Sequence, residues 1–342
     1  MYSEKPLLHE RQSHHVPGNL RTVAVDVTSR CNMSCDHCYA ETFNKVAELD
    51  LETWHKVADE LYEMGVFHYV IQGGEPTVTR DRLAALVSMI RPDETYINVV
   101  SNGWTMTPEM AHWLRQIKVD KVTFSMDSGI PEEHDQNRLP GSFVRVVAAV
   151  DLVLTEGLFS SVSTVVTHSN LHGEGFQKVL EFAKSRGIRV DIQIAEPVGK
   201  WDGIKEDLIT PEDADYIKHL RDTMGQADNG QPMINRDTYC GDNDHCPAGT
   251  EFMSISANGE LLSCNFLQFS LGNVRDGSIA QKRRDLLTCS WFDNSHRTCI
   301  CGEDDEFIDR FIVPFKEEAK PLDAYSVFDL PNAWPGRSAQ HG

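Results

Sequence analysis

Three cysteines lie close together near the start of the chain, at Cys31, Cys35 and Cys38. They come directly after a short apolar run at 22–27, so the C-x3-C-x2-C spacing falls on a loop that follows a predicted strand. Thiolates are soft ligands, and iron–sulfur clusters are normally held by cysteine thiolates. Three local thiolates on a cluster of four irons would leave one iron open to a non-protein ligand. A zinc site is the alternative, with His37 as the nearby candidate for a fourth ligand.

The composition limits the class of protein. The chain has 342 residues, 40% hydrophobic and 25% charged, which indicates two domains or one large barrel with an addition. The formal net charge of -20 disfavours nucleic acid and anionic membrane surfaces, because phosphate binding needs clustered cations. No membrane-length apolar run and no secretory signal are present, so we expect a cytoplasmic location. In a reducing compartment, nine cysteines are more often metal ligands or catalysts than disulfides.

Apolar runs alternate with helical patterns from residue 21 onward. The predicted strands are 21–27, 68–72, 96–100, 121–125, 160–166 and 189–195. The predicted helices between them are 51–64, 80–90, 107–117, 142–156 and 173–185. This alternation predicts an α/β fold of successive strand–helix units with a parallel sheet, which right-handed connections curl toward a barrel.

The polar residues that could bind a ligand fall where these strands end. They are Gly73-Gly74-Glu75-Pro76, Ser101-Asn102-Gly103, Ser125-Met126-Asp127-Ser128 and Glu196-Pro197-Val198-Gly199. Because parallel barrels bind ligands at the carboxyl ends of their strands, we expect these residues to share one site with the cysteine loop. Taken alone, Gly-Gly-Glu-Pro would be a plain turn and Asp127 a helix cap.

The second half of the chain has a different pattern. A helix is predicted from Thr210 and Pro211 to about Met224, followed by a linker at 225–235. Six further cysteines then appear, and Asn258-Gly259 between two apolar runs predicts a hairpin that Cys246 precedes and Cys264 ends. The resulting division is an arm at 1–20, a core at 21–205, a helix and linker at 206–236, a cysteine-rich domain at 237–313 and a tail at 314–342.

The cysteine triplet together with Gly73-Gly74-Glu75-Pro76 resembles the radical S-adenosylmethionine (radical SAM) superfamily. The resemblance implies a partial (β/α)6 barrel of the TIM type with a small C-terminal hairpin and iron–sulfur domain. It implies that Cys31, Cys35 and Cys38 hold a [4Fe–4S] cluster and that SAM binds the open iron. Reductive cleavage of SAM would then give a 5′-deoxyadenosyl radical that abstracts a substrate hydrogen atom.

The same resemblance assigns SAM-binding roles to the residues at the strand ends. Gly73 and Gly74 would let the backbone approach the methionyl amine, because no Cβ intervenes, and Glu75 would add a carboxylate for that ammonium. The other cofactor-binding candidates are Ser101, Asn102, Ser125, Asp127 and His37. His37 is a departure, since the family usually has an aromatic residue there, although an imidazole can also stack on adenine.

The late cysteines resemble the SPASM and twitch accessory domains, which bind auxiliary [4Fe–4S] clusters. Because few cysteines follow the hairpin, the smaller twitch form is favoured. The expected ligands are Cys246, Cys264, Cys299 and Cys301. Cys240 and Cys289 could replace one of them, could return a hydrogen atom in an epimerisation, or could be ordinary buried residues. A zinc site among the late cysteines is a further alternative.

The leading functional hypothesis is oxidation or epimerisation of a sugar-like or other small natural-product precursor. The alternatives are maturation of a ribosomally made peptide, by cross-linking or epimerisation, and a non-catalytic iron–sulfur sensor or partner protein. We expect an electron donor such as flavodoxin or ferredoxin, with neither nucleic acid nor membrane as a partner. The acidic run 303–306 could line a pocket for a cationic substrate, or could be a solvated charge run.

Overall fold

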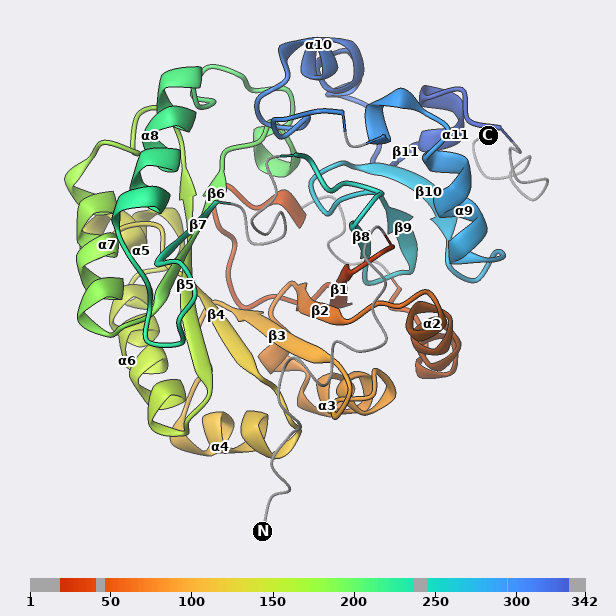
Figure 1. Cartoon of the computed structure of the whole chain (residues 1–342). Coiled ribbons are helices and arrows are strands. Elements are labelled where there is room, and N and C mark those ends of the chain that lie inside the picture. The colour runs from red at the N-terminus through yellow and green to blue at the C-terminus, as the bar shows by residue number, and fades with distance from the viewer. Residues whose placement is uncertain (1–18, 41–46, 237–244, 294, 332–342) are drawn as a thin grey trace.

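Parallel strands form the centre of the molecule. The computed structural model describes residues 19–40, 47–236, 245–293 and 295–331. Seven strands of this part pair in parallel and in chain order, and they curve into an open barrel (Figure 1). They are β1 (Thr22–Thr28), β2 (His68–Gly73), β3 (Tyr96–Ser101), β4 (Lys121–Ser125), β5 (Phe159–Val166), β6 (Arg189–Ile194) and β7 (Ile234–Arg236).

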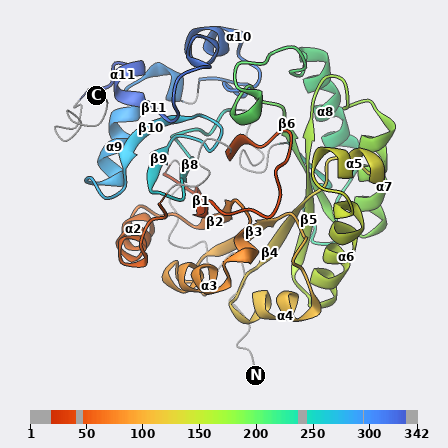
Figure 2. The same ribbon diagram turned by 180° about the vertical axis from the view of Figure 1, so that it is seen from behind.

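Helices cover the outer face of this sheet, as both views show (Figures 1 and 2). They are α2 (Leu51–Glu63), α3 (Arg80–Met89), α4 (Pro108–Gln116), α5 (Pro131–Asn137), α6 (Ser142–Thr155), α7 (Glu174–Ser185) and α8 (Pro211–Thr223). Every strand and helix that the sequence predicts in the barrel is present, with bounds that differ by no more than one residue at either end. The predicted α/β class and partial TIM-type barrel are therefore confirmed.

Local chemistry explains why these elements begin where they do. β1 is buried along its whole length, because a strand between barrel interior and helices needs apolar side chains on both faces. The helix α8 begins with a capping box, in which the Thr210 side chain accepts from the Asp213 N–H and the Asp213 carboxylate accepts from the Thr210 N–H. Such caps fix where each helix starts and so how each connection leaves the sheet.

The cysteine-rich segment continues the barrel sheet. Its hairpin is formed by β8 (Phe252–Ile255) and β9 (Glu260–Leu262), which confirms the predicted turn at Asn258-Gly259. β8 pairs in parallel with β1, so the described strands form one sheet in the order β11-β10-β9-β8-β1-β2-β3-β4-β5-β6-β7. The remaining elements are β10 (Phe269–Asn273), α9 (Ile279–Leu286), α10 (Asp305–Phe307), β11 (Leu322–Asp323) and α11 (Ala324–Val327).

Three parts of the fold differ from the sequence prediction. The linker 225–235 runs into β7, because Ile234 is hidden beside β6 and Asn235 donates to the buried Asp191 at 3.1 Å. The helix α5 was missed because its residues Pro131–Asn137 are almost all polar and show no apolar face. The described part of the predicted tail, 314–331, packs on the cysteine-rich segment, where the rings of Phe328 and Phe269 have centroids 4.9 Å apart.

The predicted N-terminal arm lies outside the described residues except for its last two. Leu20 is 1% exposed and belongs to the hydrophobic core. Within the described ranges, no helix is both long and apolar enough to cross a membrane.

Candidate active site

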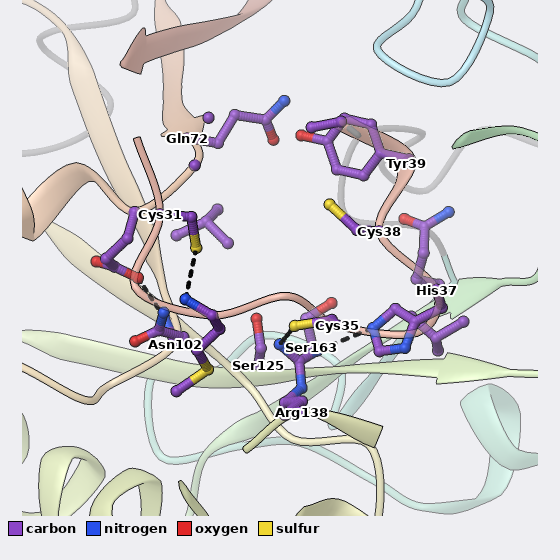
Figure 3. A pocket seen from close by; sticks show the side chains of 18 of the residues that line it. Cys31, Cys35, His37, Cys38, Tyr39, Gln72, Asn102, Ser125, Arg138 and Ser163 are labelled. Carbon is purple, nitrogen blue, oxygen red and sulfur yellow. Dashed lines mark hydrogen bonds between the residues drawn. The ribbon is translucent and has the colours of Figure 1, made fainter. Parts of the chain in front are cut away.

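The early cysteines share one cavity. The loop after β1 carries Cys31, Cys35 and Cys38, and all three line a cavity of about 860 Å³. Figure 3 shows their thiols extending toward the same space. The cavity lies at the carboxyl ends of the barrel strands, where parallel barrels bind their ligands, and its volume is near the upper end for a small-molecule site.

Gly73 and Gly74 hold the start of the cysteine loop. A Cβ on Gly73, whose φ is +127°, would lie 2.4 Å from the carbonyl oxygen of Thr28, and a Cβ on Gly74 would lie 2.1 Å from that of Arg30. The Gly74 N–H donates to the Thr28 carbonyl at 2.8 Å. The sequence prediction assigned these glycines to the methionyl amine. In the structure their missing side chains admit the protein's own loop, because that backbone occupies the space a Cβ would need. Both glycines also line the cavity, and their role at the methionyl amine stays a prediction.

Glu75 is a buried acceptor for the neighbouring strand end. Its carboxylate accepts from the Ser101 hydroxyl at 2.9 Å, from the Asn102 N–H at 2.7 Å and from both the N–H and hydroxyl of Thr77. Burial raises the pKa of Glu75, and these hydrogen bonds oppose the shift. The Asn102 amide in turn donates to Asn32 at 2.9 Å. Glu75 therefore ties the end of β3 to the cysteine loop while lining the cavity.

Ser125 lines the cavity as predicted, but Asp127 does not. The Asp127 carboxylate accepts two hydrogen bonds from the Arg138 guanidinium, at 2.7 and 2.8 Å. Its contact with SAM or substrate stays a prediction. Burial opposes ionisation of Asp127, but Arg138 and His37 outweigh it and hold its pKa well below the ordinary value. Arg138 itself lines the cavity. Sequence reasoning missed it because the residue follows a polar helix that was not predicted.

His37 is enclosed on the cavity wall. Its Nε2 lies 3.2 Å from Nη2 of Arg138, and its ring is 5.9 Å from that of Trp201 in a tilted arrangement. Burial lowers the pKa of His37, although the charge of Asp127 opposes this. The predicted role of His37 in stacking on adenine stays a prediction.

The far end of the cysteine loop is held by distant parts of the chain. Gly199, after β6, has a φ of +61°, and a Cβ there would lie 2.3 Å from the Cys38 carbonyl oxygen. Tyr39 packs edge-on against Phe266, with centroids 5.0 Å apart, and its carbonyl accepts from the Gln268 amide at 2.9 Å. The barrel and the cysteine-rich segment thus clamp this loop together.

The late cysteines come together beside the same cavity. Cys301 is 1% exposed, and its pKa is raised well above the ordinary value by burial and then by the neighbouring Glu196, Cys264 and Cys246. The Cys299 thiol donates to the Glu196 carboxylate at 3.5 Å. Because Glu196 also lines the cavity, one side chain borders both sites.

Only one of the two catalytic candidates, Cys289, lies among the described residues, and it does not line the cavity. Cys289 precedes the short 3-10 helix Ser290–Phe292, packs against the core and is not among the cavity-lining residues. The structure therefore gives Cys289 no contact with the site. Cys240 lies outside the described residues.

The acidic run 303–306 is engaged in local contacts and does not line the cavity. Glu303 pairs with Arg236 and accepts from the Cys299 N–H at 2.8 Å. Asp304 caps α10, and Asp305 pairs with Lys205 at 3.0 Å. The interpretation of this run as the lining of a pocket for a cationic substrate stays a prediction.

Neither cysteine set is arranged around a single ion. In the part of the chain that the structure describes, no three His, Cys, Asp or Glu side chains are placed to hold one metal ion. An iron–sulfur cluster differs from a single ion because each thiolate binds its own iron, which lets the thiols lie farther apart.

A family comparison accounts for the early site. Residues 25–185 match the model of the Radical SAM superfamily, and this range contains both the cysteine triplet and Gly73-Gly74-Glu75-Pro76. The chain carries a radical SAM domain. A [4Fe–4S] cluster and SAM are the cofactors of this superfamily, as the resemblance implied.

Similar proteins come from two functional groups. The AdoMet-dependent heme synthase of Methanosarcina barkeri is 25% identical over 283 residues, which cover 75% of this chain and 80% of that protein. The PqqA peptide cyclase of Granulibacter bethesdensis is 26% identical over 271 residues, covering 75% and 71%. Among solved structures, Streptococcus suis SuiB bound to precursor peptide SuiA superposes with a TM-score of 0.65 at 14% identity, covering 94% of this chain and 79% of that one. This last likeness concerns the fold.

The donor set fits the cluster that the radical SAM family uses. Cys31, Cys35 and Cys38 are thiols on one loop facing one cavity, which is the chemistry a [4Fe–4S] cluster needs with one iron left open. The buried Arg138 beside Cys35 supplies positive charge next to the thiolates.

Proposed function

We propose that this radical SAM enzyme matures a peptide by removing a hydrogen atom from one of its residues, with oxidation or epimerisation as the outcome. The relatives that modify peptides favour this alternative over the sugar-like substrate of the leading hypothesis. The observation that carries the proposal is an unpartnered amide in the cavity wall.

That amide belongs to Gln193 on β6. The side chain is 7% exposed and lines the cavity, and its Nε2 has no hydrogen-bond partner among the described residues. A buried N–H group without a partner is costly, so such a group in a cavity wall indicates a ligand acceptor. A peptide carbonyl is an acceptor of the right kind, and the hydroxyl of Ser163 on neighbouring β5 lines the same wall.

The chain's own residues bind and orient the cofactors. Cys31, Cys35 and Cys38 would hold the cluster, and the wall from Glu75 to Asn102 would face SAM. When bound, the cluster and SAM supply the 5′-deoxyadenosyl radical that abstracts hydrogen. The protein's part is to hold the substrate carbon beside this group and to exclude water, as in other cofactor enzymes.

The region 237–313 would form an auxiliary-cluster domain, with Cys246, Cys264, Cys299 and Cys301 as ligands. An oxidised product requires that the substrate radical lose one more electron, and an auxiliary cluster supplies an acceptor for it. The neighbourhood of Cys301 beside the cavity supports this placement. Flavodoxin or ferredoxin would reduce the early cluster.

A second candidate is a step of heme synthesis, which the similarity to the Methanosarcina barkeri protein favours. The two candidates differ in the charge the substrate carries. A tetrapyrrole with several carboxylates needs cations, which Arg30 and Arg138 supply on the cysteine-loop side of the cavity, whereas β5, β6 and the segment after β6 present Ser163, Gln193 and Glu196.

Substrate-dependent cleavage of SAM tests the proposal. Anaerobically reconstituted enzyme is given SAM, dithionite and either peptides encoded beside its gene or a tetrapyrrole carboxylic acid. We expect 5′-deoxyadenosine to form in step with a peptide that has lost two hydrogens or, in D2O, gained one deuterium. Stoichiometric turnover of the tetrapyrrole with unchanged peptides would instead establish the second candidate.

A pair of variants links the peptide to the wall. Gln193→Leu keeps the size of the side chain but removes the amide, so we expect the KM for the peptide to rise about tenfold, the effect of one buried hydrogen bond. Gln177→Leu is the matched control, because Gln177 lies on α7 and donates to Tyr216 at 3.2 Å away from the cavity.

A further inference from the structure

Arg138 is fixed by an ion pair on one side and points at a cysteine on the other. It follows α5, and its Nε and Nη2 donate to the two carboxylate oxygens of Asp127 at 2.7 and 2.8 Å. This two-pronged contact leaves the planar guanidinium little freedom. The side chain of Arg138 is 9% exposed and that of Asp127 is 3% exposed, so solvent screens the pair weakly.

The remaining nitrogen of Arg138 meets the early cysteine motif. Nη1 donates to the Cys35 thiol at 3.7 Å, while Nη2 also lies 3.2 Å from His37 (Figure 3). The sulfur of Cys35 therefore lies beside a cation whose position Asp127 determines. Lys200, which donates to the adjacent Ser34 at 3.0 Å, adds a second positive charge on the same side.

Cys31 has the opposite surroundings. Its sulfur accepts from the Met33 N–H at 3.4 Å, and the negative charge of the Glu75 carboxylate acts on it. Cys35 therefore receives a hydrogen bond from a guanidinium, whereas Cys31 has a carboxylate as its charged neighbour, although the sequence shows three equivalent cysteines.

We propose that Arg138, oriented by Asp127, donates a charge-assisted hydrogen bond to the Cys35 thiolate and thereby raises the reduction potential of the cluster that the early cysteines hold. Adding an electron to the cluster increases its negative charge. A buried hydrogen-bond donor at a ligating sulfur stabilises that reduced form more than the oxidised one. Arg138 is thus a positioning residue for electron entry, and the proposal rests on the cluster site and not on the identity of the substrate.

A redox titration followed by electron paramagnetic resonance tests this on the reconstituted full chain without SAM, with dithionite as the reductant. The Cys31/Cys35/Cys38→Ala variant, titrated in parallel, identifies any signal from the late cysteines. In an Asp127→Asn/Arg138→Gln variant, which removes both buried charges together, we expect the midpoint to become more negative. A tenfold loss in the one-electron equilibrium corresponds to about 59 mV.

Single substitutions should shift the reduction midpoint by smaller amounts than the double variant does. Arg138→Lys keeps the charge but lacks the fork that reaches Asp127 and Cys35 together, so its midpoint should fall between wild type and the double variant. Lys200→Gln should shift the midpoint less than the double variant does, because solvent screens that exposed contact. Arg145→Lys is the control that should leave the midpoint unchanged, since Arg145 stacks on Trp104 and contacts no cysteine.

Two outcomes would overturn the proposal. An unchanged midpoint together with weaker SAM binding would make Arg138 a ligand-binding residue with no effect on the potential. Loss of iron from both Arg138→Lys and the double variant would make it a structural support of the loop. Iron content is measured on every sample, so failure of this proposal is distinct from failure of the peptide assignment, which leaves the midpoints unaffected.

Discussion

The two cysteine sites of this chain are built in opposite ways. The early site takes its three thiols from one loop of eight residues, 31–38, whose ends are held by glycine contacts from β2 and from the segment after β6. The late site gathers Cys246, Cys264 and Cys301 from both sides of a hairpin and from a later loop. The early site borders the cation Arg138, whereas the late site borders the carboxylate of Glu196.

This difference gives the thiols of the two sites different electrostatic surroundings. A buried cation beside a thiolate stabilises the extra negative charge of a reduced cluster. The early site takes all its thiols from one short loop, which the rest of the chain only has to hold in place. The late site exists only when the hairpin and the loop that carries Cys301 have packed on the barrel.

The largest effect is expected from removing the early thiols together. Cys31/Cys35/Cys38→Ala should abolish 5′-deoxyadenosine formation and lower the iron content from about eight to about four per chain, because each cluster contains four irons. Anaerobic iron and sulfide analysis with Mössbauer spectra measures this. A fall from about four irons to none would show that the late cysteines hold no cluster.

The converse change should separate the two sites. Cys301→Ala is expected to lower iron to about four while SAM is still cleaved, because only the late ligand set is broken. The modified peptide should then disappear from the products. Cys289→Ala is the matched control and should keep both iron and product, since Cys289 lies away from the cavity. Equal losses in the two variants would contradict the assignment of Cys301.

A smaller effect is expected where the barrel supports the early loop. Gly199→Ala forces a positive φ on alanine, at a cost of about 1–2 kcal/mol, and also pushes its Cβ against the Cys38 carbonyl. We expect SAM cleavage to fall about tenfold while the late iron is retained. Gly230→Ala is the control, because Gly230 has a φ of +78° and a Cβ added there would meet nothing within 4 Å. If both variants lost activity equally, backbone strain alone would be the cause.

The smallest effect is expected at β1, the strand that pairs with β2 of the barrel and with β8 of the cysteine-rich segment. Burial raises the pKa of Asp26 to about 7, and a hydrogen bond from Gln72 opposes the shift. The folded protein therefore binds the carboxyl proton of Asp26 more tightly than the unfolded protein does. The free energy of unfolding consequently falls as pH rises from about 4 to about 7. Asp26→Asn should flatten that slope and stabilise the chain above pH 7 by about 1–4 kcal/mol.

Chemical denaturation of the cluster-free protein across this pH range measures the effect of Asp26→Asn. The matched comparison is Asp50→Asn, whose carboxyl caps α2 at the surface and has a lowered pKa, so its loss should act with the opposite sign. An unchanged slope for Asp26→Asn would contradict the buried, protonated state.

Sequence reasoning succeeded where information is local. The periodicity of apolar residues and the helix-capping residues predicted the strands and helices of the barrel to within one residue. The spacing of three cysteines predicted the early loop. It failed where a short polar segment gains its structure from its neighbours, as in α5 and β7. It also did not find the pairing of Asp127 with Arg138, because no periodic pattern links these two residues.

The sequence by itself determined the radical SAM chemistry of this chain, since three cysteines and a Gly-Gly-Glu-Pro turn are short-range patterns with few alternative meanings. Only the tertiary structure decided which charges surround each sulfur. That decision depends on side chains such as Arg138 and Glu196, which lie about 100 residues from the cysteines that they contact. Because electrostatic effects depend on distance and burial rather than on order along the chain, the fold had to be known before the two cysteine sites could be told apart.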